Sequence, residues 1–205
     1  DTIRDVGVHG WLTASEVMTH SSNIGLIKLA LSLERGDFYE SLRSFGFGTR
    51  SGIGLPAESA GLLRPAQEWS ERSLETISIG QEVSVTAVQL VQAFGAIANG
   101  GTLMAPRVIA EVRDADGQLL QRTRPQAVRR VVSPTTSGVL RSMLRRAVRE
   151  GTGRNAAIPG VEVAGKTGTA QRALAGGGGY AEDEYVSSFV GFLPATQQPR
   201  YLCLV

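Results

Sequence analysis

The segment Gly160-Val-Glu-Val-Ala-Gly-Lys-Thr167 constrains the fold more than any other part of this 205-residue chain. It matches the phosphate-binding pattern G-x-x-x-x-G-K-T, in which a loop holds phosphates and a helix begins beside the lysine. The interior Val-Glu-Val-Ala, however, alternates like a strand, and glycine-rich sequence follows Lys166 instead of an amphipathic helix. The segment therefore predicts a strand that carries Lys166, and it leaves a P-loop nucleotide hydrolase as the least favoured alternative.

Three strand candidates lie near the end of the chain, at residues 161–171, 185–193 and 200–205. The glycine run at 176–179 predicts a flexible hairpin loop between the first two. Helices precede this set of strands, which must therefore pair mainly antiparallel. The predicted fold class is α/β or α+β, with an antiparallel sheet flanked by helices.

Capping residues and the spacing of apolar residues mark the helices. Two helices are predicted between residues 13 and 35, meeting near Ser21, because Ser and Asn side chains cap free backbone N–H groups. Thr86 begins a helix that ends near residue 99, and Ser133, followed by proline, begins another that ends near residue 150. The remaining predictions are a short helix after residue 37, a long loop at 46–65 and a β-hairpin formed by 107–113 and 118–123.

The composition excludes several classes of function. With 21 Lys and Arg against 19 Asp and Glu, the net charge is only +2, so we expect no nucleic-acid partner. A single cysteine, Cys203, excludes an internal disulfide, and two histidines disfavour a metal site or a histidine-based catalytic triad. Only Lys28 and Lys166 are lysines, and lysine, unlike arginine, can release a proton.

Lys166 begins the motif Lys-Thr-Gly-Thr, which ends at Thr169. On a strand, this motif would present the ammonium group and the threonine hydroxyls along one side of a cleft, and Gly168 would let a substrate backbone approach closely. The motif Ser21-x-Asn23 lies upstream, at a predicted helix boundary. The two motifs together occur in serine β-lactamases and penicillin-binding proteins.

Further motifs follow in order along nearly the whole chain, and the succession resembles the transpeptidase domain of a class B penicillin-binding protein. The nearest resemblance is to the division-type septal enzymes. The motifs are His-Ser-Ser-Asn-Ile-Gly at 20–25, Phe-Gly-Phe-Gly-Thr at 45–49, Gly-Ile-Gly-Leu-Pro at 52–56, Ser-Ile-Gly-Gln at 78–81, Val-Thr-Ala-Val-Gln-Leu at 85–90, Ala-Ile-Ala-Asn-Gly-Gly at 96–101, Glu-Gly-Thr-Gly at 150–153 and Gly-Lys-Thr-Gly-Thr-Ala-Gln at 165–171.

The resemblance implies a peptidoglycan D,D-transpeptidase that uses no cofactor and is inhibited by β-lactams. In this family, the serine of a Ser-x-x-Lys motif attacks the D-Ala-D-Ala bond of a stem peptide, and the amine of a neighbouring stem peptide then takes the acyl group. Ser21 would relay a proton towards the leaving amine. Asn23 would hydrogen-bond the substrate amide and Lys166, and Lys166 would attract the terminal carboxylate.

The resemblance also assigns Thr167, Gly168 and Thr169 to substrate binding. The two hydroxyls would hydrogen-bond the carboxylate that Lys166 attracts. The backbone N–H of Thr169 would be one oxyanion-hole donor, a group whose loss typically costs a few kcal/mol of transition-state stabilisation. No residue is expected to bind a metal.

The expected nucleophile motif is missing from the sequence, because Gly25 and Val163 stand three residues before the two lysines. We therefore expect residues 1–205 to be a partial transpeptidase domain, truncated at both ends and unable to acylate on its own. A serine β-lactamase is one alternative, although the 145 residues from Ser21 to Lys166 suit a transpeptidase better. A catalytically silent penicillin-binding or sensor domain is another.

The resemblance also implies partners and a location. The ligands would be peptidoglycan stem peptides and β-lactams, and the protein partners would be a septal or elongation glycosyltransferase and other cell-wall synthesis proteins. The full-length protein would be anchored by a single upstream membrane span, with this domain on the extracytoplasmic face of the bacterial cytoplasmic membrane.

Overall fold

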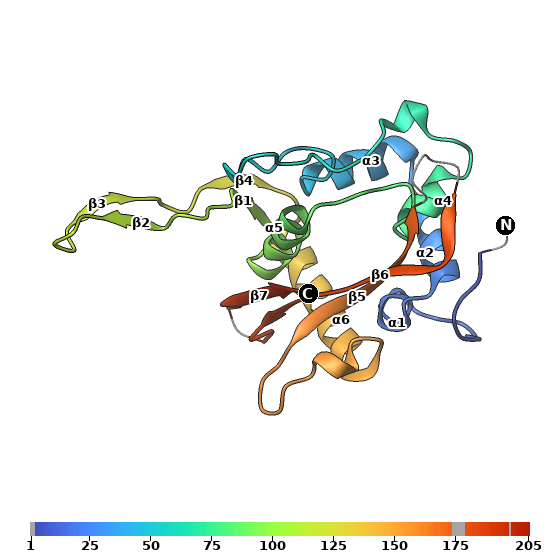
Figure 1. The fold of residues 1–205 in the computed structure, drawn as a ribbon. Helices are drawn as coiled ribbons and strands as arrows, with labels where there is room; N and C mark the ends of the chain where they lie inside the picture. Colours follow the sequence, from blue (N-terminus) through green and yellow to red (C-terminus); the bar gives the residue numbers. More distant parts are fainter. Residues whose placement is uncertain (1–2, 174–178, 197) are drawn as a thin grey trace.

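Figure 1 shows the fold as a computed structural model that describes residues 3–173, 179–196 and 198–205. In these ranges the helices are α1 (Ala14–His20), α2 (Asn23–Ala30), α3 (Arg35–Ser44), the 3-10 turn η1 (Ala66–Glu68), α4 (Ser73–Ser78), α5 (Ala87–Ala98), α6 (Pro134–Glu150) and the 3-10 turn η2 (Arg154–Ala156). The strands are β1 (Thr102–Met104), β2 (Glu111–Arg113), β3 (Leu119–Arg122), β4 (Ala127–Arg130), β5 (Ala164–Ala173), β6 (Tyr180–Leu193) and β7 (Tyr201–Leu204).

The last three strands form one antiparallel sheet, as the sequence predicts, and their order in the sheet is β5-β6-β7. Lys166 of β5 lies opposite Val190 of β6. β5 begins at Ala164 rather than at residue 161, since Val161 forms only an isolated bridge. Of the predicted hairpin loop at 176–179, residues 176–178 lie outside the described part of the chain. β5 is an edge strand of this sheet, and it carries the Lys-Thr-Gly-Thr motif.

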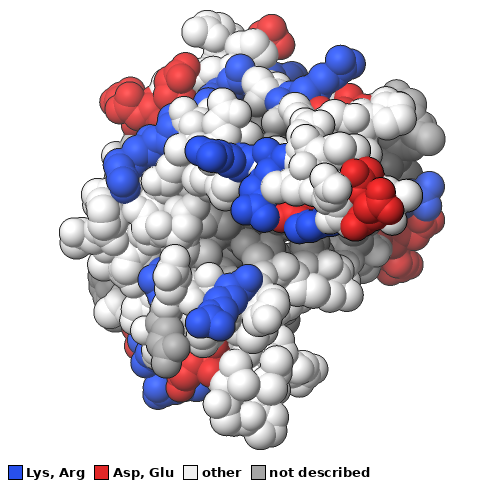
Figure 2. All heavy atoms as spheres, turned by 90° about the vertical axis from the view of Figure 1, so that its left-hand side faces the viewer, with Lys and Arg blue, Asp and Glu red and all other residues white. Residues whose placement is uncertain are grey.

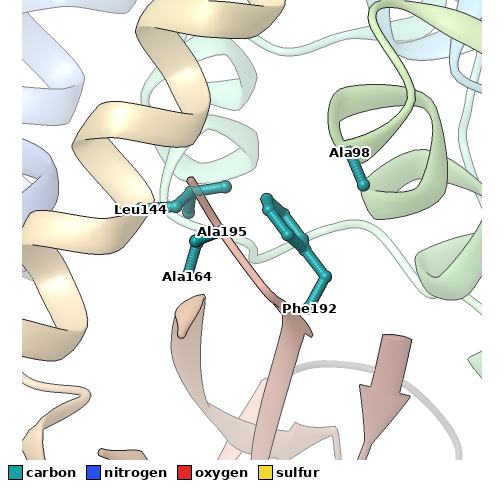
Figure 3. Close-up of a cluster of buried hydrophobic side chains, with 5 residues drawn as sticks. All are labelled: Ala98, Leu144, Ala164, Phe192 and Ala195. Carbon is teal, nitrogen blue, oxygen red and sulfur yellow. The ribbon is translucent and has the colours of Figure 1, made fainter. Parts of the chain in front are cut away.

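The core behind this sheet is built around Phe192 of β6, which is fully buried. Figure 3 shows its ring lying between Leu144 of α6 and Ala98 of α5, with Ala164 of β5 and Ala195 completing the cluster. A buried phenylalanine of this kind contributes about 3–5 kcal/mol relative to alanine. Because α6 packs on β5 and α5 packs on β7, this core fixes the position of the strand that carries Lys166.

The predicted helix starts at Thr86 and Ser133 are confirmed. Thr86 accepts a hydrogen bond from the backbone N–H of Gln89, whose side chain in turn accepts one from the N–H of Thr86, a reciprocal capping box. Ser133 accepts from the N–H of Thr136 and is followed by proline at the first helical position. Local capping chemistry therefore sets where α5 and α6 begin.

Other predicted boundaries differ from the structure. The second helix of the 13–35 region ends at Ala30, and α3 begins at Arg35, three residues before the expected start at residue 38. The six-residue helix α4 and the two short strands β1 and β4 were not predicted. These elements are too short for a periodic pattern, and the antiparallel pairing of β1 with β4 joins segments that are distant in sequence.

The predicted hairpin at 107–123 is confirmed, with shorter strands, as β2 and β3. Together with β1 and β4 it forms an arm that extends from the body of the molecule (Figure 1). Figure 2 views the molecule from the side of this arm and shows basic and acidic side chains mixed over the visible face. Arg129 of β4 holds the base of the arm by donating hydrogen bonds to the carbonyls of Ser44 and Arg43 at the end of α3.

Candidate active site

Ser21 stands at the junction of α1 and α2 in a left-handed backbone conformation, with φ 56° and ψ 44°. It is the C-cap residue of α1, and its N–H donates to the carbonyls of Met18 and Val17. This conformation costs a residue with a side chain roughly 1 kcal/mol relative to glycine. The position therefore stores strain where a glycine would be the ordinary choice, which is typical of functional sites.

Asp5 and Ser22 hold the other side of this junction. The buried Ser22 is the N-cap of α2, and its hydroxyl accepts from the N–H of Gly25 and donates to Asp5 Oδ2 at 2.7 Å. Asp5 Oδ1 accepts from the N–H of Ile24 at 3.0 Å. Partial burial acts to raise the pKa of Asp5, but these hydrogen bonds outweigh it and hold the pKa below its usual range. Asp5 belongs to no motif, so its role at this junction could not be predicted from the sequence.

Gly25 lets the two helices of the junction meet. A Cβ atom at this position would lie 2.5 Å from Cγ2 of Val17 and 3.0 Å from Oγ of Ser22. A side chain at residue 25 would therefore push α2 away from α1. The close packing of the two helices fixes the direction of the chain at Ser21, where α1 ends.

Lys166 reaches this junction from β5. Its Nζ donates to Ser21 Oγ at 3.0 Å, to the carbonyl of Thr167 at 3.0 Å and, at 3.4 Å, to Thr167 Oγ1. Within the described part of the chain no carboxylate lies within ion-pair distance of this ammonium. Burial lowers the pKa of Lys166. The site thus holds a partly buried cation that only neutral oxygens solvate, and such a group favours an anionic ligand.

Gly165 and Gly168 of β5 differ in how much space a side chain would have at each position. A Cβ at Gly165 would lie 2.4 Å from Cζ of Phe189 and 2.7 Å from the carbonyl oxygen of Val190, so packing excludes any side chain. A Cβ at Gly168 would meet only Ser188 Oγ, at 2.8 Å, and that hydroxyl can rotate away. The structure therefore explains Gly165 by packing, and it leaves Gly168 as the open stretch of the strand that the sequence analysis expects beside a substrate.

The two threonines of the motif lie two residues apart on β5, so they share one face of the strand. Thr167 Oγ1 is 2.8 Å from Oγ1 of Thr152, which follows the end of α6. Thr169 is exposed and lies opposite Ser187 in the ladder. Thr152 was not among the predicted site residues, although it lies in the motif Glu-Gly-Thr-Gly at 150–153.

Asn23 is placed differently from the expectation. Its side-chain Nδ2 donates to the carbonyl of Arg4 at 3.0 Å, whereas Lys166 Nζ contacts Ser21 and Thr167. The expected contact between Asn23 and Lys166 is therefore absent from the described structure. The reason is local, because the segment that carries Arg4 and Asp5 lies against the start of α2 and supplies the nearer acceptor.

The phosphate-loop alternative is wrong. Residues 164–173 form a continuous strand through Lys166, paired with β6, and no helix begins after the lysine in that range. The ammonium group is directed to Ser21 and Thr167 rather than to a ring of backbone N–H groups.

The sequence model described as the penicillin binding protein transpeptidase domain matches residues 2–205. The chain therefore belongs to this family, as a class B penicillin-binding protein transpeptidase domain. It is 41% identical to penicillin-binding protein PbpB of Mycolicibacterium smegmatis, over 98% of this chain and 32% of that protein. It is 40% identical to stage V sporulation protein D of Bacillus subtilis, over 92% of this chain and 29% of that protein.

Solved structures of this family share the fold. Penicillin-binding protein 3 of Mycobacterium tuberculosis, complexed with ampicillin, superimposes with a TM-score of 0.89 at 39% identity, covering 98% of this chain and 46% of that one. The transpeptidase domain of penicillin-binding protein 3 from Burkholderia pseudomallei gives a TM-score of 0.84 at 36% identity, covering 98% of this chain and 57% of that one. The predicted fold class is confirmed. The chain spans about a third of the length of the curated relatives named above.

Proposed function

We propose that this chain is the part of a peptidoglycan D,D-transpeptidase that carries its proton-relay serine and its carboxylate-binding strand. The observation that carries the proposal is the 3.0 Å contact between Lys166 Nζ and Ser21 Oγ, which joins two motifs that lie 145 residues apart. Two family motifs that meet at a partly buried cation and a strained serine form one site. The family membership of the chain supports the same assignment.

The geometry of Ser21 suits proton transfer to a leaving amine. Because Ser21 Oγ accepts a hydrogen bond from Lys166, its own hydrogen is free to be donated. The neighbouring ammonium makes the hydroxyl a better acid, which favours general-acid help as the C–N bond of the substrate breaks. In the proposed step, the nucleophile forms an ester with the penultimate D-Ala, and the terminal D-Ala leaves with a proton supplied through Ser21.

The cation of Lys166 suits a substrate that ends in a carboxylate. A D-Ala-D-Ala peptide ends in a carboxylate, and a β-lactam carries an equivalent carboxylate. Charge-assisted hydrogen bonds of the kind that Lys166, Thr167 and Thr169 would make to it are about twice as strong as neutral ones. Since no Ser-x-x-Lys occurs in residues 1–205, the proposal places the nucleophile in a part of the protein outside this chain.

The location and partners are proposed on the same basis. No helix in the described ranges combines the length and the apolar character needed to cross a bilayer. We propose a single-pass anchor elsewhere in the protein, with this domain on the extracytoplasmic side of the cytoplasmic membrane. There it would act with a peptidoglycan glycosyltransferase of septal or elongation type.

Cross-linking of stem peptides by the whole gene product tests the function. With a D-Ala-D-Ala-terminated donor peptide and an amine acceptor peptide, we expect one D-Ala to be released for each cross-link formed. Replacing the cation in Lys166→Met removes both the carboxylate anchor and the contact to Ser21, and should lower the rate at least ~100-fold. Lys28→Met is the matched control, because Lys28 is exposed on α2, and should leave the rate unchanged.

The alternatives give different results in this assay. Turnover of β-lactam without cross-linking would identify a β-lactamase. Neither cross-linking nor acylation by β-lactam would identify a silent binding or sensor domain. Equal loss of activity in Lys28→Met and Lys166→Met would contradict the site.

A further inference from the structure

The turn after α6 places a single side chain between two buried glycines. Gly151 and Gly153 are buried, whereas Thr152 is exposed. A Cβ at Gly151 would lie 2.1 Å from the carbonyl oxygen of Thr19, and a Cβ at Gly153 would lie 3.3 Å from the carbonyl oxygen of Ala147. The backbone of the turn is therefore pressed against α1 and α6, which leaves Thr152 little freedom to move.

This turn is bonded to both halves of the candidate active site. The N–H of Thr152 donates to the carbonyl of Thr19 at 3.3 Å, one of the carbonyls that the end of α1 leaves unpaired, two residues before Ser21. The Thr152 hydroxyl lies 2.8 Å from that of Thr167, the residue after Lys166. One residue thus connects the helix that ends at Ser21 with the strand that carries the cation.

The hydroxyl pair has a simple proton count. Each threonine has one O–H, and the 2.8 Å contact uses one of the two hydrogens whichever residue is the donor. The ammonium of Lys166, 3.4 Å from Thr167 Oγ1, supplies only hydrogens and cannot accept the second one. The pair therefore keeps one hydroxyl hydrogen for a ligand, and this hydrogen is on Thr167 when Thr152 is the donor. Thr152 also restricts rotation of the Thr167 hydroxyl about its side-chain bond.

We propose that Thr152 is a positioning residue, which orients the Thr167 hydroxyl towards the carboxylate of the substrate or β-lactam. The inference rests on the proposed transpeptidase function and extends it to a residue outside the two motifs. Thr152 acts on Thr167 through its hydroxyl, and its backbone N–H fixes the turn to the end of α1.

The test compares acylation of the whole gene product by benzylpenicillin and by its methyl ester, which lacks the carboxylate charge. Thr152→Val removes the hydroxyl but keeps the shape of the side chain. We expect the second-order rate of acylation by the acid to fall about tenfold, the loss of one hydrogen bond to a charged group, and the rate for the ester to change little. Thr152→Ser should keep the preference for the acid, and Thr135→Val, an exposed position in the first turn of α6, is the matched control.

A second arm places Thr152→Val in a Thr167→Val background. In that background, Thr152→Val should not change the acylation rate further, because the Thr167 hydroxyl through which Thr152 acts has been removed. The inference is overturned if Thr152→Val leaves the acid-to-ester ratio unchanged, or if its effect persists without the Thr167 hydroxyl. In those cases the wild type still acylates and the proposed function stands. If the wild type fails to acylate with either compound, the proposed function and this inference both fail.

Discussion

Ser21 shows how one residue combines strain with chemistry. Its left-handed backbone would suit glycine, yet Ser21 places a hydroxyl oxygen 3.0 Å from Lys166 Nζ. Hydrogen bonds on both sides keep Ser21 in this conformation. They are made by the end of α1 before it and by the Ser22 cap of α2 after it. Stability is thus given up at this position, and under the proposed function it is given up for a correctly placed proton donor, a compromise common at active sites.

Two substitutions of Ser21 separate strain from chemistry. Ser21→Ala and Ser21→Gly both remove the proton relay, so both should lower the cross-linking rate by about 100-fold or more. Only glycine relieves the left-handed backbone, so the glycine variant should be more stable than the alanine variant by about 1 kcal/mol. Denaturant unfolding measures the difference. Equal stability of the two variants would contradict the assigned strain, and full activity of either would contradict the relay.

At the scale of elements, a helix and a hairpin meet at Glu82, another residue in the left-handed region, with φ 57°. Its carboxylate accepts hydrogen bonds from Ser73 at 2.8 Å and Thr76 at 2.5 Å and pairs with Arg64. Its backbone N–H donates to the hydroxyl of Tyr180, the first residue of β6, at 2.8 Å. Glu82 therefore ties α4 to the far end of the β5–β6 pair, which continues the strand of Lys166.

The pKa of Glu82 gives this connection a pH dependence. Burial acts to raise that pKa, but the hydrogen bonds from Thr76 and Ser73 and the charge of Arg64 outweigh it, so the pKa lies below its ordinary value of 4.5. A carboxylate with a lowered folded-state pKa contributes stability that is present above its unfolded-state pKa and lost as the pH falls through the folded one. Glu82→Gln should therefore destabilise the protein by about 1–3 kcal/mol at pH 7.

The same difference should begin to shrink as the pH falls below 4.5, where the carboxyl of the unfolded chain becomes neutral, and should be lost as the pH falls through the lower pKa of the folded state. Thermal or denaturant unfolding of both proteins at pH 7 and at pH 3 measures it. Glu75→Gln, on the same α4 helix, is the control, because among the described residues the Glu75 carboxylate makes a single long ion pair, to Arg72 at 3.8 Å. A difference between wild type and Glu82→Gln that is independent of pH would contradict the role of the charge.

Elements with local signals were predictable from the sequence, and those built on distant pairing were not. Thr86 and Ser133 cap their helices with groups only three residues away, so the starts of α5 and α6 could be predicted. β1 and β4 depend on pairing Thr102 with Arg130, which no local pattern specifies. The same holds for the site. Motifs predicted that Ser21 and Lys166 act together, but the contact of Thr152 with Thr167 arises only when α6 packs on the sheet.

At the scale of the whole molecule, the fold brings the two motifs together through a shared core. α6 packs against both α1 and β5, and α5 packs on α6, β6 and β7, so α6 links the sheet to the α1–α2 junction and α5 supports α6 and the sheet. Phe192 and Leu144 fill the space between them (Figure 3). The contact between Ser21 and Lys166 is therefore a product of the entire described fold rather than of either motif alone.

We propose that this fold completes a penicillin-reactive site whose nucleophile lies outside residues 1–205. Intact-mass and peptide mass spectrometry of the whole gene product after exposure to benzylpenicillin tests it most directly. We expect a long-lived covalent adduct on a serine outside this chain, formed at least ~100-fold more slowly in Lys166→Met and unchanged in rate in Lys28→Met. An adduct on Ser21, or no adduct in the wild type, would contradict the account.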